Sequence, residues 1–570
     1  MAKRLNLKTI LTISVLHLCI CSAGLADKVI YVDDDANGLN DGSSWVNAYK
    51  YLQNALADAN SSSKPVEIRV SEGIYTPDSN SAQPNGTGDR QATFQLINGV
   101  TLKGGYAGFG KPDPNARDIK LYETILSGDL DGNDVDVNDP CDLLTEPSRA
   151  ENSYHLVVVG IGADIGADAN AVLDGFIITA GNANGEDYPN YQSIGGGIHI
   201  RWSFRPIEQG PILTNCKFTQ NSAKSGGGMF TDHTTAILTN CTFSENFAIW
   251  GGGIGNDGHP GPKLVNCTLN DNCASYKGGA IANAESRPAL ENCTLIANHA
   301  QLGGAIYNGE SGATLTNCTV IGNLAERGGA VFNNDGDVTM TSCVVKENSC
   351  TDRGGVVYLS SDDIAWLTNC VLTANSAGQG GALYIGNDSY AKLTNCTLNG
   401  NRATNNGGAL YLGVPDSAIV TNCILWLNKP QAIYPELLGS KIVITYNDVQ
   451  GGWIGEGNIN TDPCFAGSNN GDYHLKSQAG RWDVNEGRWT KDEVTSLCID
   501  AGDPASPIGL EPFPNGGIIN MGAYGGTAEA SKSYFGKPIC ETIVAGDING
   551  DCKVNLTDFA LMAFHWLEER

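Results

Sequence analysis

A cysteine returns at nearly constant spacing through the middle of the chain. Its successive copies lie 25, 26, 26, 25, 25, 27, 26 and 27 residues apart. The members of this series are Cys216, Cys241, Cys267, Cys293, Cys318, Cys343, Cys370, Cys396 and Cys423. A period this regular is the signature of a repeat protein, in which each unit packs mainly against its two neighbours.

Aligning the repeats on the cysteine reveals further fixed positions. An aliphatic residue stands three places before it, another apolar residue two places after it, and an asparagine five places after it. A glycine pair follows, as in Gly303 and Gly304, and the second residue after the pair is always aliphatic, as in Ile306. These are short runs of period two separated by Asn and Gly corners. No run has the length or periodicity of a helix, which excludes the helical solenoids.

We therefore predict an all-β fold in which residues 190–430 form the regular coils of a parallel β-helix. Each coil carries about three strands and stacks roughly 4.8 Å above the previous one. Cysteine and aliphatic columns then point inward, and the asparagines bond one coil to the next. The series has nine cysteines that all point the same way, so we interpret them as buried thiols rather than disulfides.

The first 26 residues have the pattern of a secretory signal peptide. Lys3 and Arg4 precede the apolar run from Ile10 to Ile20, and Gly24-Leu25-Ala26 offers a small-x-small cleavage site. A membrane anchor is the alternative, but the apolar run is too short to span a bilayer. The sequence thus predicts export, with no transmembrane helix after cleavage and a secreted or outer-surface location.

The charge balance limits the partners. The chain has 62 acidic against 35 basic residues, a formal net charge of −27. Such a protein repels nucleic acid and anionic membranes, so neither is expected as a partner.

Two less regular regions flank the repeats. We predict that residues 27–189 form an N-terminal cap with irregular first coils, including a strand at 29–32 and a helical stretch near 48–59. Residues 431–535 are predicted to form the final coils and a closing segment. A cap is required because an open β-helix end exposes unpaired backbone. The acidic stretch from Asp129 to Asp136 could hold calcium, or it could simply be solvated.

Residues 540–570 contain a sharper calcium motif. Oxygen-bearing side chains occupy loop positions 1, 3, 5, 9 and 12, and position 7 offers a backbone carbonyl. In order, with position 7 included, these residues are Asp547, Asn549, Asp551, Lys553, Asn555 and Asp558. Cys552 replaces the usual glycine, and the last ligand is Asp rather than Glu. We predict a calcium loop followed by a short helix; an acidic surface turn is the alternative.

Several of these motifs resemble known families. The coil motifs Gly303-Gly304-Ala305-Ile306 and Phe243-Ser-Glu-Asn246 resemble polymorphic outer-membrane protein repeats of the pectin-lyase-like superfamily, which implies a right-handed, single-stranded β-helix. Together with the segments 31–35, 500–503 and 520–524, the layout is similar to secreted β-helix proteins of planctomycete-type bacteria. The tail resembles a type I dockerin repeat, which implies calcium binding and a cohesin-like protein partner. Dockerins normally carry two such repeats, and this chain has one.

The superfamily includes polysaccharide lyases and hydrolases as well as adhesins, so the chemistry must come from particular residues. Glu326-Arg327 and Asp352-Arg353 stand just before the glycine pair in adjacent repeats and should stack. They are candidate catalytic residues, because such enzymes need carboxylates at defined separation or a base beside them. The alternative is a set of surface ion pairs between coils.

A binding function has a different signal. An aromatic residue stands three places after the glycine pair in five successive repeats: Tyr307, Phe332, Tyr358, Tyr384 and Tyr411. Strand alternation points this position outward, so the rings could form a platform for sugar rings. Alternatively, the rings stabilise one another across strands or lie under a loop.

Taken together, the sequence predicts an exported β-helix protein that binds or processes carbohydrate on a polysaccharide or cell-surface glycan. A calcium-binding, dockerin-like tail would attach it. Two other classes remain open: a polysaccharide lyase or glycoside hydrolase, and a purely structural or adhesive surface rod without affinity for sugars.

Overall fold

The computed structural model describes most of the chain. The described residues are 28–160, 170–187, 191–201, 210–413, 415–436 and 441–534, together with Val554, Leu556 and Phe559. The expected signal peptide and the six residues of the expected calcium loop lie outside them.

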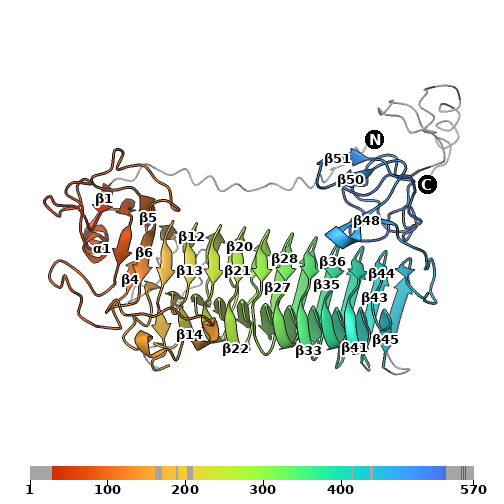
Figure 1. Ribbon diagram of the computed structural model, residues 1–570, viewed down its shortest axis with the longest axis horizontal. Helices are drawn as coiled ribbons and strands as arrows, with labels where there is room; N and C mark the ends of the chain where they lie inside the picture. Colours follow the sequence, from red (N-terminus) through yellow and green to blue (C-terminus); the bar gives the residue numbers. More distant parts are fainter. Residues whose placement is uncertain are drawn as a thin grey trace, which may run out of the picture.

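The strands wind into a long rod (Figure 1). Sheet 1 has 14 strands, from β1 (Lys28–Val32) to β46 (Lys441–Thr445), and sheet 2 has 13, from β3 (Gly73–Tyr75) to β47 (Asp448–Val449). Sheet 3 has 12 strands, and all pairings within these three sheets are parallel. The predicted all-β parallel β-helix is confirmed, and it extends beyond residues 190–430 because β1 and β46 belong to one continuous sheet.

Sheet 3 carries the candidate site. Its strands, in spatial order, are β4 (Phe94–Leu96), β7 (Val157–Val159), β11 (Ile198–Ile200), β15 (Met229–Asp232), β19 (Ile254–Asp257), β23 (Ile281–Ala284), β26 (Ile306–Gly309), β30 (Val331–Asn334), β34 (Val357–Leu359), β38 (Leu383–Ile385), β42 (Leu410–Leu412) and β45 (Ile433–Pro435).

One coil shows how the chain travels. It passes along β24 (Ala289–Glu291) of sheet 1, turns into β25 (Thr294–Ile296) of sheet 2, and then reaches β26 of sheet 3. In other coils an extra strand bridges sheets 2 and 3. These extra strands form two four-stranded sheets: β10 (Asn182–Ala183), β14 (Ser222–Ser225), β18 (Phe247–Trp250) and β22 (Cys273–Lys277); and β29 (Leu324–Arg327), β33 (Ser349–Arg353), β37 (Ser376–Gln379) and β41 (Arg402–Asn406).

The interior of the rod is built from the columns that the sequence predicts. All nine repeat cysteines are buried free thiols within the main hydrophobic core, as expected. Eight of the nine thiols donate to a carbonyl oxygen of the preceding coil, as Cys318 Sγ does to Leu290 O at 3.5 Å. Asn298 Nδ2 donates both to Asn323 Oδ1 at 2.9 Å and to Leu269 O at 3.0 Å. Because the buried amides are paired from coil to coil, their burial costs little.

The corners explain the fixed Asn and Gly positions. The asparagine before the repeat cysteine adopts a left-handed backbone, with φ of 53° at both Asn292 and Asn317. Asn tolerates this region better than most residues. The first glycine of the pair does the same, with φ of 67° at Gly303, and a Cβ there would collide with the carbonyl oxygen of Ile306. Only glycine fits that corner.

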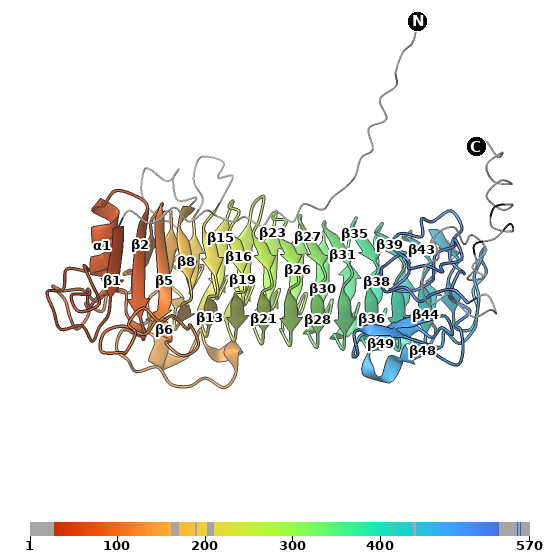
Figure 2. The same ribbon diagram turned by 90° about the horizontal axis from the view of Figure 1, so that it is seen from above.

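Both ends of the rod are covered. Helix α1 (Leu52–Ser61) packs its apolar face, including Leu52 and Leu56, against the first strands, which confirms the helix predicted near residues 48–59. At the other end, Trp453 packs against the core of the last coils. Hairpin β48–β49 (Phe465–Gly467, Asp472–Leu475) then folds back along the flank of sheet 2, and hairpin β50–β51 (Arg481–Asp483, Arg488–Thr490) lies beyond it (Figures 1 and 2).

The returning C-terminal segment contacts the coils directly. Tyr473 packs against Val371 and Ala523, and Asn369 Nδ2 donates to the carbonyl oxygen of Ala523 at 2.9 Å. The segment therefore covers part of the outer surface of sheet 2. Within the described residues, no helix has the length and apolar character needed to cross a membrane.

Candidate functional site

The outward-facing position of sheet 3 forms a second column, which we call the outer column. It has one residue on each strand from β11 to β45: His199, Phe230, Gly255, Ala282, Tyr307, Phe332, Tyr358, Tyr384, Tyr411 and Tyr434. From Tyr307 to Tyr411 neighbouring rings stack with centroids 4.8–5.5 Å apart and planes within 26° of parallel. These five rings form a compact cluster of their own, separate from the core.

This stacking corrects the expectation of an exposed aromatic platform. The five rings do point away from the core, as strand alternation predicts, but only 3–8% of each residue is exposed. Their faces are occupied by the neighbouring rings, because consecutive coils bring the same residue directly above itself. The alternative interpretation, rings that stabilise one another across strands, describes this part of the column. A role of these residues in glycan binding stays a prediction.

Towards the N-terminus the outer column is interrupted. Phe230 is followed by Gly255 on β19 and Ala282 on β23 before the aromatic series resumes at Tyr307. Two successive coils therefore lack a ring at a position that the following coils all fill. The register is regular across the interruption, so the missing volume is not taken up by a shifted strand.

A cleft of about 590 Å³ lies at this interruption. Its floor and ends include Ala282, Phe230 and Tyr307, and its side wall is formed by Ile249 and Trp250 of β18. Trp250 is 48% exposed, a large value for so apolar a side chain. Exposed aromatic surface beside a concave site is typical of ligand binding.

Charged side chains also line the cleft. Lys224 Nζ lies 3.2 Å from Asp187 Oδ1 on one side. Lys277 Nζ lies 4.4 Å from the centre of the Tyr307 ring, in a cation–π arrangement. The protein atoms packed around Asp257, followed by the negative charge of Asp232, raise the pKa of Asp257 above its ordinary value. The cleft thus combines aromatic faces with carboxylate and ammonium groups.

Two buried histidines stand beyond Phe230. The His199 ring meets Phe230 edge to face at 5.9 Å and lies 5.2 Å from His155, whose Nδ1 is 3.2 Å from the Gly195 carbonyl oxygen. Burial lowers the pKa of His155 to about 4 and that of His199 well below its ordinary value. Both are therefore neutral at physiological pH and act as packing partners at the end of the cleft.

The comparison with family models agrees with this architecture. The model of the right-handed β-helix region matches residues 159–320 and 303–470, which together make up more than half of the chain. The chain belongs to the right-handed β-helix family. The handedness that the repeats implied by resemblance is thereby shown, and a further model, described as disaggregatase related, matches residues 444–502.

Similarity to individual proteins is low. No curated protein matches this β-helix protein. Among solved structures, a pectate lyase has 12% identity and a TM-score of 0.33 over 87% of this chain and 96% of its own. A rhamnogalacturonan lyase has 10% identity and a TM-score of 0.28 over 77% of this chain and 90% of its own. Likeness at this level carries no argument about function.

The four candidate catalytic residues lie outside the cleft of the β-helix. Arg327 Nε is 2.8 Å from Asp352 Oδ2, and Arg353 Nε is 3.6 Å from Asp352 Oδ1. Arg353 also lies over the Tyr384 ring at 4.9 Å, while Glu326 is exposed. The coils do bring the basic residues together, since Arg327 pairs in register with Arg353. The arrangement corresponds to the alternative interpretation, surface ion pairs between coils.

The acidic stretch at residues 129–136 is only partly assembled into a cluster. Carboxylate oxygens of Asp129, Asp134 and Glu151 lie within 4.8 Å of one another. The guanidinium of the buried Arg149 is 3.1 Å from Asp134, so this carboxylate already has a cationic partner. The cluster forms part of the packing of an insertion against the rod, and calcium binding there stays a prediction.

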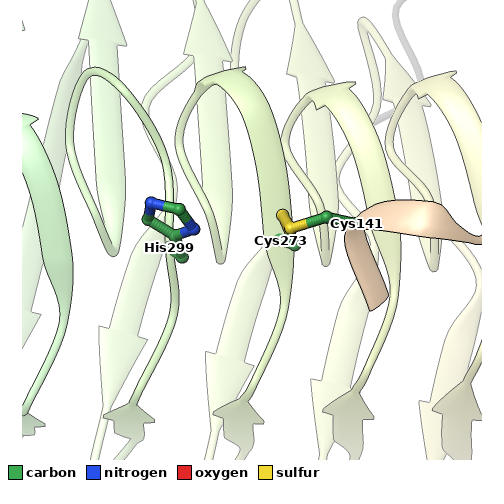
Figure 3. Close-up of side chains that lie close together, drawn as sticks. All are labelled: Cys141, Cys273 and His299. Carbon is green, nitrogen blue, oxygen red and sulfur yellow. A yellow bond between two sulfur atoms is a disulfide. The ribbon is translucent and has the colours of Figure 1, made fainter. Parts of the chain in front are cut away.

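The same insertion is tied to the rod by a disulfide that the sequence analysis missed. Cys141 bonds to Cys273 on β22, 132 residues further along, and His299 lies on the adjacent coil (Figure 3). Leu143 and Phe247 pack beside the disulfide. The sequence offered one indication of this pair, namely that neither cysteine belongs to the series spaced at 25 to 27 residues. Only the folded insertion shows that they meet.

Proposed function

We propose that this β-helix protein binds carbohydrate in the cleft of sheet 3. The observation that carries the proposal is the combination, in one cavity of about 590 Å³, of the aromatic side chains Phe230, Trp250 and Tyr307 with charged groups. A sugar ring has apolar faces and a rim of hydroxyls, so it needs aromatic and hydrogen-bonding partners together. The volume also lies in the range of ligand pockets.

The test compares two exposed tryptophans. Trp250 lines the cleft, whereas Trp366 lies on sheet 1 and is similarly exposed, at 41% against 48%. Binding of cellohexaose, mannohexaose, xylohexaose and hexagalacturonate would be measured by calorimetry. We expect Trp250→Ala to weaken binding of the retained sugar by about tenfold or more, and Trp366→Ala to leave it unchanged. Absence of binding to every sugar of a wider glycan array would instead support the purely structural rod.

A polysaccharide-degrading enzyme is the second candidate, and one observation favours it. Asp257 borders the cleft, and the protein atoms around it raise its pKa above the ordinary value, which is the direction that favours a protonated carboxyl group able to act as a general acid. Release of reducing or unsaturated sugar ends would identify a hydrolase or a lyase. If Asp257 is catalytic, Asp257→Asn should abolish release, while Asp335→Asn, at a corner outside the cleft, should retain it.

We also propose that the protein is exported, on the support of the signal-peptide pattern in residues 1–26. Amino-terminal sequencing of the protein recovered from the culture medium should begin at Asp27. Recovery of an uncleaved chain from the cytosol would contradict export. The resemblance of the coils to polymorphic outer-membrane protein repeats supports a surface location in the same way.

The C-terminal loop is proposed to bind calcium and to attach the protein through a dockerin-like contact. The support is the spacing of oxygen ligands from Asp547 to Asp558. Calcium titration of the full chain should lose one binding event in the double variant Asp547→Ala with Asp551→Ala, while Asp129→Asn serves as the control for the other acidic cluster. Capture of a cohesin-like protein that requires calcium would establish the attachment role.

A further inference from the structure

We propose that the interruption of the outer column is itself the ring-binding subsite: a pyranose ring of the glycan occupies the place above Ala282 that an aromatic side chain fills in the following coils. Gly255 and Ala282 would then determine specificity by being small. This inference rests on the proposed carbohydrate binding and adds to it which residues receive the sugar ring.

The register gives the size of the vacancy. Phe230 and Tyr307 are three coil steps apart, and at roughly 4.8 Å per step their column positions are ~14 Å apart. The stacked rings further along repeat at 4.8–5.5 Å. The interruption therefore has room for two rings in the same stacking direction, and the cleft lies over both coils.

One of these two places is already partly occupied. A Cβ built on Gly255 would lie 3.0 Å from Cδ2 of Phe230 and 2.7 Å from Oγ of Ser225, so the Phe230 ring leans over the glycine. Glycine at this position is what allows the ring to lie there. The place above Ala282 remains open, next to Tyr307.

A hydrogen-bond donor stands ready at the open place. Lys277 Nζ lies 4.4 Å from the Tyr307 ring centre and 5.1 Å from that of Tyr276. Among the described residues, no carboxylate lies within 4.0 Å of this ammonium group. Its three donors can therefore turn to the hydroxyls of a sugar that stacks beside Tyr307. An apolar face flanked by free donors matches a pyranose ring better than a wholly apolar ligand.

The side wall makes the open place above Ala282 a partly enclosed site rather than a shallow depression of the surface. Trp250 and Ile249 of β18 border the open place, and Asp257 and Ala284 line the end of the β19 and β23 strands. A ring above Ala282 would contact the cleft on several sides, which gives binding both area and direction. The small residues and the walls occur in the same coils.

The experiment fills the open place above Ala282 with an aromatic side chain of the protein itself. Ala282→Phe places in β23 the residue that β30 carries at Phe332, so the variant should stack on Tyr307 and keep or raise the melting temperature. We expect it to weaken binding of the oligosaccharide retained by the parent by about tenfold or more, measured by calorimetry with the four hexasaccharides named above. Ala282→Ser, which changes polarity but hardly volume, should bind within about twofold of the parent.

The outcomes separate the two proposals. If the parent binds, Trp250→Ala weakens binding and Ala282→Phe does not, the subsite is overturned while the carbohydrate-binding function stands. If the parent binds neither the four hexasaccharides nor any sugar of the wider glycan array, both proposals fail. Should Ala282→Phe not fold, Ala282→Val provides the second variant: a smaller loss of affinity than the tenfold expected for a ring supports the subsite, and parental affinity overturns it.

Discussion

The two faces of sheet 3 obey different rules. The inward column runs through Ile254, Ile281, Ile306 and Val331 without a break, and each of these residues is fully buried. The outer column consists of stacked rings over most of its length and is interrupted over two coils, at Gly255 and Ala282. Inside the rod a missing side chain would leave an empty cavity, which is costly. Outside, the same omission opens to solvent, so variation is tolerated there and can create a site.

The largest expected effect comes from breaking the inward rule. Leu315 is fully buried, whereas its neighbour Thr314 on the same strand, β27 (Gly312–Thr316), is exposed. Leu315→Asp should lower the free energy of unfolding by on the order of 5 kcal/mol, because it combines a lost apolar side chain with an unpaired buried carboxylate. Thr314→Asp should change it by less than about 0.5 kcal/mol. The urea midpoints of both variants measure this contrast; equal midpoints would contradict it.

The next effect concerns the cross-link on the outside of the rod. The Cys141–Cys273 disulfide closes a segment of 132 residues. Replacing both cysteines by serine should destabilise the protein by about 4 kcal/mol, since a long loop regains its freedom in the unfolded chain. Cys464→Ser, which removes a free thiol, is the control. An unchanged unfolding midpoint of the double variant would show that the insertion is held by its packing alone.

The uninterrupted part of the outward column gives a medium effect. Tyr358 is 6% exposed and stacks on Phe332 and Tyr384. Tyr358→Ala should cost about 2–4 kcal/mol of stability, because it removes a mostly buried ring from the stack. Tyr276→Ala, at a ring that is 41% exposed, should cost far less. If Tyr358→Ala instead abolished sugar binding at unchanged stability, the platform expected from the sequence would be restored.

The smallest effect is a pH dependence in the C-terminal cover of sheet 2. Burial raises the pKa of Glu511 to about 7, although its carboxylate accepts from Asn520 N and Gly526 N. Between the unfolded pKa near 4.5 and about 7 the folded protein keeps a proton that the unfolded chain releases. Stability should therefore be highest below this window and fall by at most about 3 kcal/mol as the pH rises through it.

Glu511→Gln tests this dependence because it imitates the protonated carboxyl. The urea midpoint of the parent should differ between about pH 5 and pH 8, and the variant should lack the part of this difference that Glu511 contributes. Glu529→Gln is the matched control, since the Glu529 side chain is 47% exposed. A parental pH profile in the Glu511 variant would assign the dependence to other groups.

Much of the architecture could be read from the repeats. The positions of Cys318, Asn298 and Ile306 follow from a period that every coil repeats, so each column had many independent observations behind it. The aromatic series from Tyr307 onward was equally clear in the sequence. The same position in the three preceding repeats is occupied by Phe230, Gly255 and Ala282. The sequence therefore contains the interruption, but it does not say that Trp250 stands beside it as a wall.

The sequence by itself determined the parallel β-helix, because stacked coils demand the same inward residue at the same place in every repeat. It could not determine which rings are covered: Tyr358 points outward as predicted, yet its neighbours bury it. Nor could it pair Cys141 with Cys273, because an insertion outside the period has no register to follow. Only the tertiary structure decided the cleft, since its floor, its aromatic ends and its side wall come from segments that no repeat rule relates to one another.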